Sequence, residues 1–184
     1  MFENVVEPEF IVTAALIMVP AYLANGMALV TGGGLPLDRG KVFSDGRRLL
    51  GDGKTVSGTV GGIVLGTLGG IITVLILNLI YFQGEMIIPY FAMVFIVACG
   101  ALLGDIITAF GKRRRGFQRG APVPVVDQLG FILMALLLAY IFNLYLPLVV
   151  LTVELLIILV IVTPFIHLLA NYIGYKIGRK NVPW

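Results

Sequence analysis

The sequence predicts an all-α integral membrane protein with five transmembrane helices. Hydrophobic residues make up 59% of its 184 residues and charged residues only 12%, whereas an average soluble domain carries about 25% charged residues. Five apolar runs approach the length of about 20 residues that crosses the hydrocarbon layer of a membrane. These runs are Phe10–Val30, Gly58–Phe82, Ile87–Phe110, Val126–Leu146 and Leu148–Tyr172. We expect them to form one domain over residues 1–184.

The thirteen Lys and Arg residues fall in three segments, which predicts the orientation. They are Arg39, Lys41, Arg47, Arg48 and Lys54 after the first run, Lys112, Arg113, Arg114, Arg115 and Arg119 after the third, and Lys176, Arg179 and Lys180 at the C-terminus. The N-terminal segment and the turns at 83–86 and 145–147 contain none. By the positive-inside rule, the N-terminus lies outside the cell membrane, and both long loops and the C-terminus lie in the cytoplasm. The N-terminal segment also lacks the basic start of a cleavable signal peptide.

The second run carries glycines at strict four-residue spacing. Gly58, Gly62, Gly66 and Gly70 lie on one helix face, where they allow a neighbouring helix to approach closely. Close helix packing is the favoured interpretation. A smooth groove for a lipid chain is the alternative.

Several polar residues interrupt the apolar runs. Asn25 either bridges helices or contacts a substrate, and the sequence supports both interpretations equally. Glu154, expected about two turns inside the last helix, and His167 near its other end are assigned no site role, because a lone His is more often a hydrogen-bonded structural residue. Cys99 is the one cysteine, so it forms no internal disulfide.

The first long loop, Thr31–Ser57, ends in a sequence with the chemistry of a phosphate site. Gly51-Asp52-Gly53-Lys54-Thr55 resembles the end of a P-loop, but Arg48 occupies the place of the first glycine and no strand precedes it, so a P-loop fold is excluded. Gly51 and Gly53 let backbone amides approach an anion, and Lys54 adds a positive charge next to a helix N-terminus. Thr55 or Ser57 can equally be a plain N-cap.

Two carboxylates flank the second basic segment. Asp105 is expected about six residues, roughly 9 Å, inside the third helix, and Asp127 begins the fourth. The short connection predicts neighbouring helices, with both carboxylates at similar depth. Mg²⁺ prefers one or two carboxylates together with phosphate oxygens. The alternative is that the acids only satisfy each other or nearby arginines, and that the cations set topology and contact anionic lipid headgroups.

Two long motifs resemble the CDP-archaeol synthases, the archaeal relatives of CDP-diacylglycerol synthases. They are GDGKTVSG in the first loop and GDIITAFGKRRRGFQRGAPVPVVDQLGF in the second, with PAYLANG and LPLDRGKVFSDGRRLLG as agreeing flanks. The resemblance covers almost the whole chain. It implies a Mg²⁺-dependent membrane enzyme that transfers a cytidylyl group from CTP to 2,3-bis-O-geranylgeranylglycerol 1-phosphate and releases pyrophosphate.

The resemblance also implies roles for particular residues. The metal ligands and catalytic acids are Asp105 and Asp127, and the catalytic cations are Lys112 and Arg113. The residues implied to bind CTP or its phosphates are Asp52, Gly53, Lys54, Thr55 and Arg119, with Asn25 and Asp38 as weaker candidates. One departure is visible, because Gly130 stands where the wider signature usually carries another acid.

Other function classes have less support. The DGxxAR pattern of CDP-alcohol phosphotransferases and the DDxxD segments of prenyltransferases are absent from the sequence. A small lipid or solute transporter without catalysis is the alternative, although the polar residues crowd one face and no inverted repeat is visible. The expected partners are CTP, an isoprenoid glycerol phosphate and membrane lipids. We expect no nucleic acid, because the cations lie beside membrane helices, and no obligate protein partner is evident.

Overall fold

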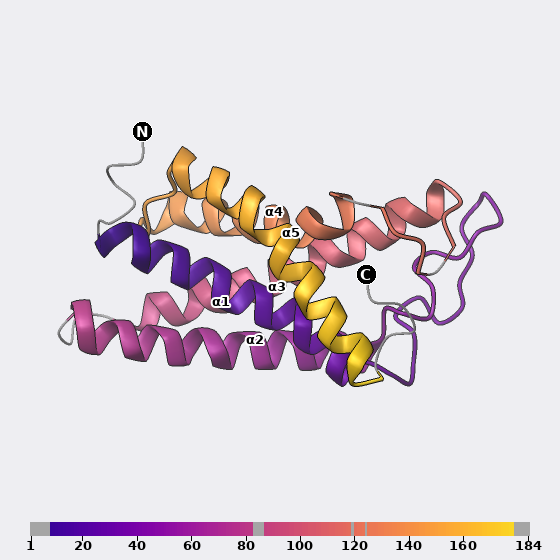
Figure 1. The fold of residues 1–184 in the computed structure, drawn as a ribbon, viewed down its shortest axis with the longest axis horizontal. Helices are drawn as coiled ribbons and strands as arrows, with labels where there is room; N and C mark the ends of the chain where they lie inside the picture. Colours follow the sequence, from indigo (N-terminus) through magenta and orange to yellow (C-terminus); the bar gives the residue numbers. More distant parts are fainter. Residues whose placement is uncertain (1–7, 83–86, 119, 124, 179–184) are drawn as a thin grey trace.

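The computed structural model describes residues 8–82, 87–118, 120–123 and 125–178 and shows a bundle of five long helices (Figure 1). The helices are α1 (Pro8–Thr31), α2 (Val56–Leu77), α3 (Ile88–Arg114), α4 (Val126–Tyr145) and α5 (Val153–Lys176), and a π-helical turn, η2 (Asn78–Phe82), continues α2. All five are long and apolar enough to cross a membrane. The five-helix prediction is therefore confirmed.

The end of the third helix differs from the prediction. Helix α3 runs four residues past Phe110 and ends at Arg114, so Lys112 and Arg113 lie in its last turn and not in a loop. Positive side chains near a helix C-terminus interact favourably with the helix dipole, which explains why the basic residues continue the helix. The charged segment is consequently held on a rigid element.

The start of the fifth helix also differs. The Asn143 side chain accepts hydrogen bonds from the amides of Leu148 and Val149 at 2.7 and 3.1 Å. These bonds fold the connection after α4, and Thr152 then caps α5 by accepting from the Leu155 amide. Helix α5 therefore begins at Val153, and Glu154 lies in its first turn instead of two turns inside.

The glycine-rich face of α2 is filled by its neighbours. A Cβ atom on Gly62 would lie 2.6 Å from the carbonyl oxygen of Ala24, and one on Gly66 would lie 2.8 Å from that of Pro20. A Cβ atom on Gly70 would meet Val94 of α3 at 2.6 Å. The packing interpretation is confirmed, because α1 and α3 occupy the space that a lipid chain would need.

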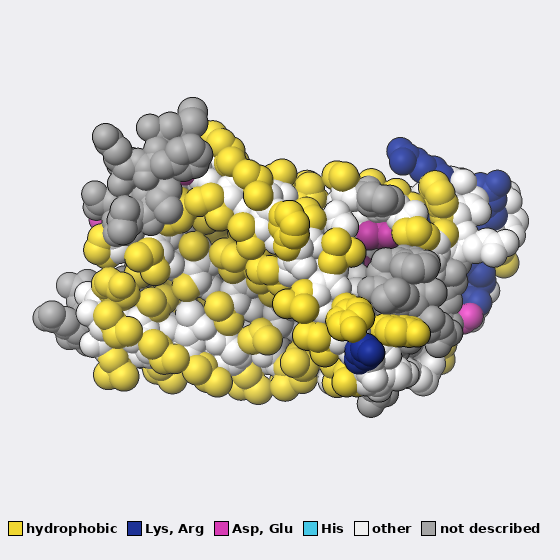
Figure 2. All heavy atoms as spheres, in the orientation of Figure 1, with side chains coloured by type: hydrophobic (Ala, Val, Ile, Leu, Met, Phe, Trp, Pro, Cys, Tyr) yellow, Lys and Arg dark blue, Asp and Glu magenta, His cyan; other side chains and the backbone are white. Residues whose placement is uncertain are grey.

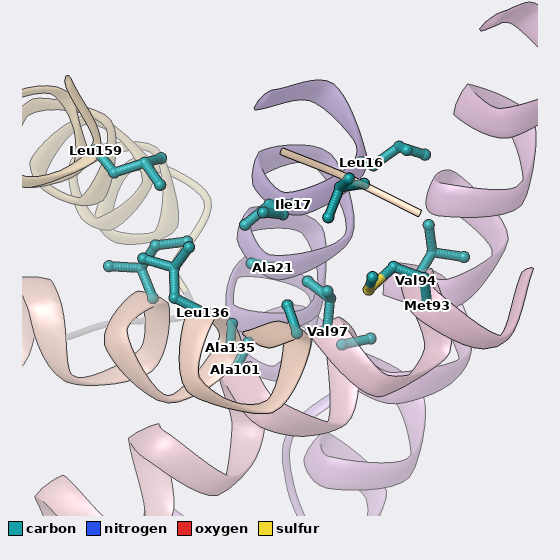
Figure 3. Close-up of a cluster of buried hydrophobic side chains, with 14 of the residues drawn as sticks. Leu16, Ile17, Ala21, Met93, Val94, Val97, Ala101, Ala135, Leu136 and Leu159 are labelled. Atoms are coloured by element: carbon teal, nitrogen blue, oxygen red, sulfur yellow. The ribbon is translucent and has the colours of Figure 1, made fainter. Parts of the chain in front are cut away.

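Helix α1 lies at the centre of the bundle. Its residues Leu16, Ile17 and Ala21 are fully buried and face side chains of α3 and α4, such as Val97 and Ala135 (Figure 3). Helix α5 lies across this core, where the hydroxyl groups of Tyr22 and Thr163 are 2.7 Å apart.

The two ends of the bundle differ in polarity. The α1–α2 and α3–α4 connections lie at one end, and the α4–α5 connection lies at the other with the start of α1 (Figure 1). Apolar side chains cover the length of the face shown in Figure 2, whereas Lys and Arg side chains gather at the end that holds the two long connections. The polar residues of distant segments therefore converge on one end.

Candidate active site

A cavity of about 670 Å³ lies where the two long connections meet the helix bundle. We define the first loop as residues 32–55 and the second loop as residues 115–125. All five helices and both loops contribute to the lining. The polar and charged lining residues are Asn25, Lys54, Thr55, Thr59, Asp105, Thr108, Lys112, Arg113, Asp127, Gln128, His167 and Asn171.

The first ion pair in the cavity joins the first loop to α3. Lys54 Nζ lies 2.5 Å from Asp105 Oδ2, although the two residues are 51 positions apart in the sequence. Both side chains are about one-quarter exposed, at 26% and 28%. The pair therefore borders the open space of the cavity.

The second ion pair joins α3 to α4. Lys112 Nζ donates to both carboxylate oxygens of Asp127 at 2.9 and 2.8 Å and to the carbonyl oxygen of Ala121 at 2.6 Å. Asp127 Oδ2 also accepts from the Val123 amide at 2.9 Å. This pair consequently fixes the second loop as well as lining the cavity.

The close contact between α3 and α4 sets how far Asp127 is offset from Asp105 along the bundle. Helices α3 and α4 touch backbone to backbone, since a Cβ atom on Gly104 would lie 2.3 Å from the Gly130 carbonyl oxygen. In this register Asp127, almost one turn before Gly130, lies about level with Thr108, three residues or roughly 5 Å along α3 from Asp105, and Lys112 reaches it with its long side chain. The longer α3 also places Asp105 nine residues, roughly 14 Å, from the helix end instead of the expected 9 Å.

A side chain at position 130 would displace the Thr108 hydroxyl group. A Cβ atom there would lie 2.1 Å from Thr108 Oγ1. In the described part of the chain, no group of three or more His, Cys, Asp or Glu side chains is arranged to hold a metal ion. A metal bound by Asp105 or Asp127 would therefore need further oxygen ligands besides these carboxylates.

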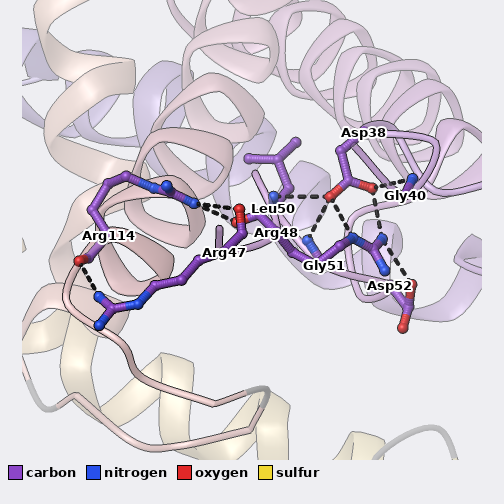
Figure 4. A network of polar contacts seen from close by, with 8 residues as sticks. All are labelled: Asp38, Gly40, Arg47, Arg48, Leu50, Gly51, Asp52 and Arg114. Carbon is purple, nitrogen blue, oxygen red and sulfur yellow. Dashed lines mark hydrogen bonds and ion pairs between the residues drawn. The ribbon is translucent and has the colours of Figure 1, made fainter. Parts of the chain in front are cut away.

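Asp38 organises the first loop from within (Figure 4). Its buried carboxylate accepts from the Arg48 guanidinium at 2.7 and 3.2 Å and from the amides of Gly40, Leu50 and Gly51 at 3.0–3.1 Å. The Arg48 guanidinium holds the pKa of this carboxyl well below its usual range, and the three amides act in the same direction. Because Asp38 uses the Gly51 amide, that amide is not free for a phosphate.

Only some of the other predicted binding residues reach the cavity. Gly53 and Thr55 line the cavity, and Thr55 caps α2 by accepting from the Gly58 amide at 3.1 Å. Asp52 and Asp38 do not line this cavity, and Asp52 pairs with Arg48 at 2.9 Å.

Asn25 and Arg113 both line the cavity. Arg113 donates to the carbonyl oxygen of Phe117 at 2.5 Å, which directs part of its guanidinium toward the second loop. Arg119 lies outside the described residues.

Two residues that received no site assignment from the sequence also line the cavity. His167 Nδ1 lies 3.1 Å from Asn171 Nδ2 on α5, and the His167 ring stacks on Phe131 of α4 with centroids 6.1 Å apart. The available signal was a His and an Asn four residues apart in an otherwise apolar helix, a spacing that puts both on one face.

Comparison with known proteins agrees with this architecture. The CarS-like CDP-archaeol synthase family profile matches residues 8–184. CDP-archaeol synthases of Methanospirillum hungatei and Thermococcus kodakarensis are each 44% identical to the chain, over 91% of its length and 100% and 92% of theirs. The CDP-archaeol synthase of Archaeoglobus fulgidus is 41% identical over 96% of this chain and 99% of its own.

A solved structure gives the same result in three dimensions. The chain is similar to an intramembrane enzyme for archaeal membrane lipids biosynthesis, with a TM-score of 0.73 and 37% identity over 86% of this chain and 92% of that one. Together with the five spanning helices, this similarity shows a multi-pass membrane protein. The resemblance in the two loop motifs is thus confirmed over the whole described bundle, and the chain belongs to the CarS-like CDP-archaeol synthase family.

Proposed function

We propose that the protein transfers a cytidylyl group from CTP to 2,3-bis-O-geranylgeranylglycerol 1-phosphate and releases pyrophosphate. The observation that carries this proposal is that two Asp–Lys pairs and Arg113 line one cavity at the junction of apolar helices and polar loops. A lipid phosphate needs such a junction, because its chains stay among the helices while its headgroup meets a soluble nucleotide. The names of the relatives support the same reaction.

Asp105 and Asp127 fit a hard divalent cation such as Mg²⁺. Both carboxylates line the cavity and remain about one-quarter exposed, at 28% and 26%, so an ion from solvent can reach them. Oxygen ligands from one or two carboxylates, completed by phosphate oxygens, are the set that Mg²⁺ prefers. When bound, the ion would neutralise phosphate charge and polarise the phosphoryl centre.

Lys54 and Lys112 supply the movable part of the proposed site. Each ammonium group now donates to a carboxylate, and each can turn its donors to phosphate oxygens when CTP enters. The α3 members of the two pairs, Asp105 and Lys112, are seven residues or about two helical turns apart, so the pairs can serve successive phosphates of an extended chain. Fixed positive groups beside the departing pyrophosphate stabilise the charge that develops there.

The proposed reaction needs no protein base. A phosphate monoester is mostly dianionic at neutral pH, because its second pKa is about 6. A lipid phosphate oxygen attacks the α-phosphorus of CTP, a new P–O bond forms, and the bond to pyrophosphate breaks. The residues of this chain therefore act by holding both reactants in line and by neutralising charge.

The experiment that tests this proposal uses purified protein with CTP, Mg²⁺ and the geranylgeranylated glycerol phosphate. We expect CDP-lipid and pyrophosphate in equal amounts, and no product when Mg²⁺ is chelated. A saturated lipid phosphate measured in parallel determines the preference for the chains. Binding of the lipid without any CDP-lipid, under conditions where a relative is active, would support the transporter alternative instead.

We also propose that the cavity opens to the cytoplasm, where CTP is available. The support is the charge asymmetry of the sequence. In a Cys99→Ala background, single cysteines at Gln83 and Gly116 should react with an impermeant thiol reagent from opposite sides of the membrane. Labelling of both from one side would contradict the five-helix topology.

A further inference from the structure

Arg114, the last residue of α3, contacts the first loop and does not line the cavity. Its guanidinium donates to the Asp45 carboxylate and to the carbonyl oxygens of Arg47 at 3.2 Å and Arg48 at 2.5 Å. It also lies over the ring of Phe43, 4.8 Å from the centroid. The side chain therefore binds the tip of the first loop, which we define as residues 42–48.

The tip also donates a hydrogen bond to α3. Arg47 Nη1 donates to the carbonyl oxygen of Arg114 at 2.7 Å, so the two arginines are linked in both directions (Figure 4). Phe43 packs edge-on against Phe110 of α3, with centroids 5.7 Å apart. The tip is thus fixed on the last turn of α3 by charge, backbone hydrogen bonds and aromatic contact.

A continuous set of hydrogen bonds connects the tip to the cavity. Arg48, at the end of the tip, holds Asp38, and Asp38 holds the amide of Gly51. Leu37, the residue directly before Asp38, donates from its amide to the Lys54 carbonyl oxygen at 2.8 Å. Gly51 has φ +91°, a conformation that favours glycine and lets the chain turn toward Lys54.

Helix α3 therefore meets the first loop at two points with different properties. At the tip, the two terminal nitrogens of Arg114 donate to protein acceptors, namely the Asp45 carboxylate and the carbonyl oxygens of Arg47 and Arg48. At Asp105, the partner is Lys54, whose ammonium group borders the cavity. If Lys54 leaves Asp105 for a phosphate, the contact at Arg114 remains as the link between α3 and the loop.

We infer that Arg114 is a positioning residue: it fixes the first loop so that Lys54 stays over the cavity when Lys54 exchanges Asp105 for a phosphate of CTP. This inference rests on the proposed function. It assigns a role to Arg114, whose side chain joins the end of α3 to the tip of the first loop. Arg114 thus acts through Lys54 without touching the nucleotide.

A double-mutant cycle on CTP binding tests the inference, using full-length protein in detergent with Mg²⁺ and calorimetry as the readout. We expect Arg114→Ala to weaken CTP binding about tenfold, because several hydrogen bonds from a charged group are lost. In a Lys54→Met background, the same change should cost no more than about twofold, since its effect passes through Lys54. Full additivity of the two changes would overturn the inference.

Two further variants keep the result interpretable. Arg115→Ala is the matched control, because Arg115 is the exposed neighbour of Arg114, and we expect its CTP affinity to stay within about twofold. Asp45→Ala removes a partner of Arg114 without altering α3, and it should weaken binding in the same direction if Arg114→Ala fails to fold. No loss in Asp45→Ala or in a folded Arg114→Ala overturns the inference alone, whereas absence of CTP binding by the unaltered protein overturns the proposed function.

Discussion

The two loops deliver the same chemistry to the cavity but are built differently. The first loop is organised around its own buried carboxylate, Asp38, and sends Lys54 across to Asp105 on α3. The second loop is bracketed by the pair between Lys112 and Asp127, which belong to the helices that it connects. One pair is long-range and joins a loop to a helix, whereas the other is local and closes a helical hairpin.

The structural role of each ion pair therefore depends on which other contacts fix the two segments that it joins. The pair of Lys54 and Asp105 can open while Asp38 and Arg114 keep the first loop in place. The pair at Asp127 also binds the Val123 amide, and its lysine binds the Ala121 carbonyl. Opening the second pair therefore loosens the connection between α3 and α4, and we expect it to contribute more to stability.

The largest effects are expected from neutralising the two acids. Asp105→Asn and Asp127→Asn each remove the charge that a hard cation needs, so each should lower turnover at least about a hundredfold. Only Asp127→Asn should also destabilise the fold, by about 2 kcal/mol, because it weakens the bonds that hold the second loop. Turnover assays and thermal unfolding in detergent measure the two properties separately.

Two results would contradict this prediction. Near-normal turnover of both variants at limiting Mg²⁺ would show that the carboxylates do not hold the metal. Equal losses of thermal stability would show that the two ion pairs have the same structural role, against the comparison of the two loops.

A smaller effect is expected from Arg113→Lys on the side of the second loop. Arg113 lines the cavity and donates one hydrogen bond to the Phe117 carbonyl oxygen. Binding a phosphate while keeping this bond needs the several donors of a planar guanidinium group. We expect turnover at saturating CTP to fall about tenfold although the charge is unchanged. The exposed Arg115, changed to Ala, should stay within about twofold. Equal, mild losses in both variants would indicate that these cations only anchor the loop to the membrane.

The sequence predicted the features that depend on local pattern. Hydropathy gave the five helices, and the four-residue glycine spacing gave the α2 packing face. The convergence of Lys54, Asp105 and Asp127 on one cavity also followed, because loops on the same side of a bundle must lie near one another.

Features that depend on long-range contacts were not predictable in this way. Nothing in the spacing assigns Lys54 to Asp105, or shows that Asp38 is enclosed by backbone amides and not turned to a substrate. The offset of Asp127 from Asp105 could not be read from the sequence either, since the close contact of Gly104 with Gly130 sets the register of α3 against α4. The place of His167 in the cavity was not predictable either, because the cavity and the stacking of its ring on Phe131 of α4 exist only in the fold.

The smallest effect is expected from Asp38→Asn, which tests the internal organisation of the first loop. Asparagine has one acceptor oxygen, and its amide group would face the donors of Arg48 and Gly51 that now bind the carboxylate. The loop should loosen while the helices stay intact. We expect faster limited proteolysis within residues 32–55, about a fivefold loss of CTP affinity, and little change in thermal unfolding.

The pH dependence separates this charge effect from a loss of shape. The pKa of Asp38 is lowered in the folded loop, so its stabilisation is complete above the unfolded value of about 3.9 and declines as the pH falls below it. Proteolysis of the unaltered loop should therefore be independent of this group near neutral pH and should accelerate only in acid, whereas Asp38→Asn should be cleaved quickly across the whole range. A variant loop as resistant as the original at neutral pH would mean that the tip contacts at Arg114, and not the buried carboxylate, hold the first loop in place.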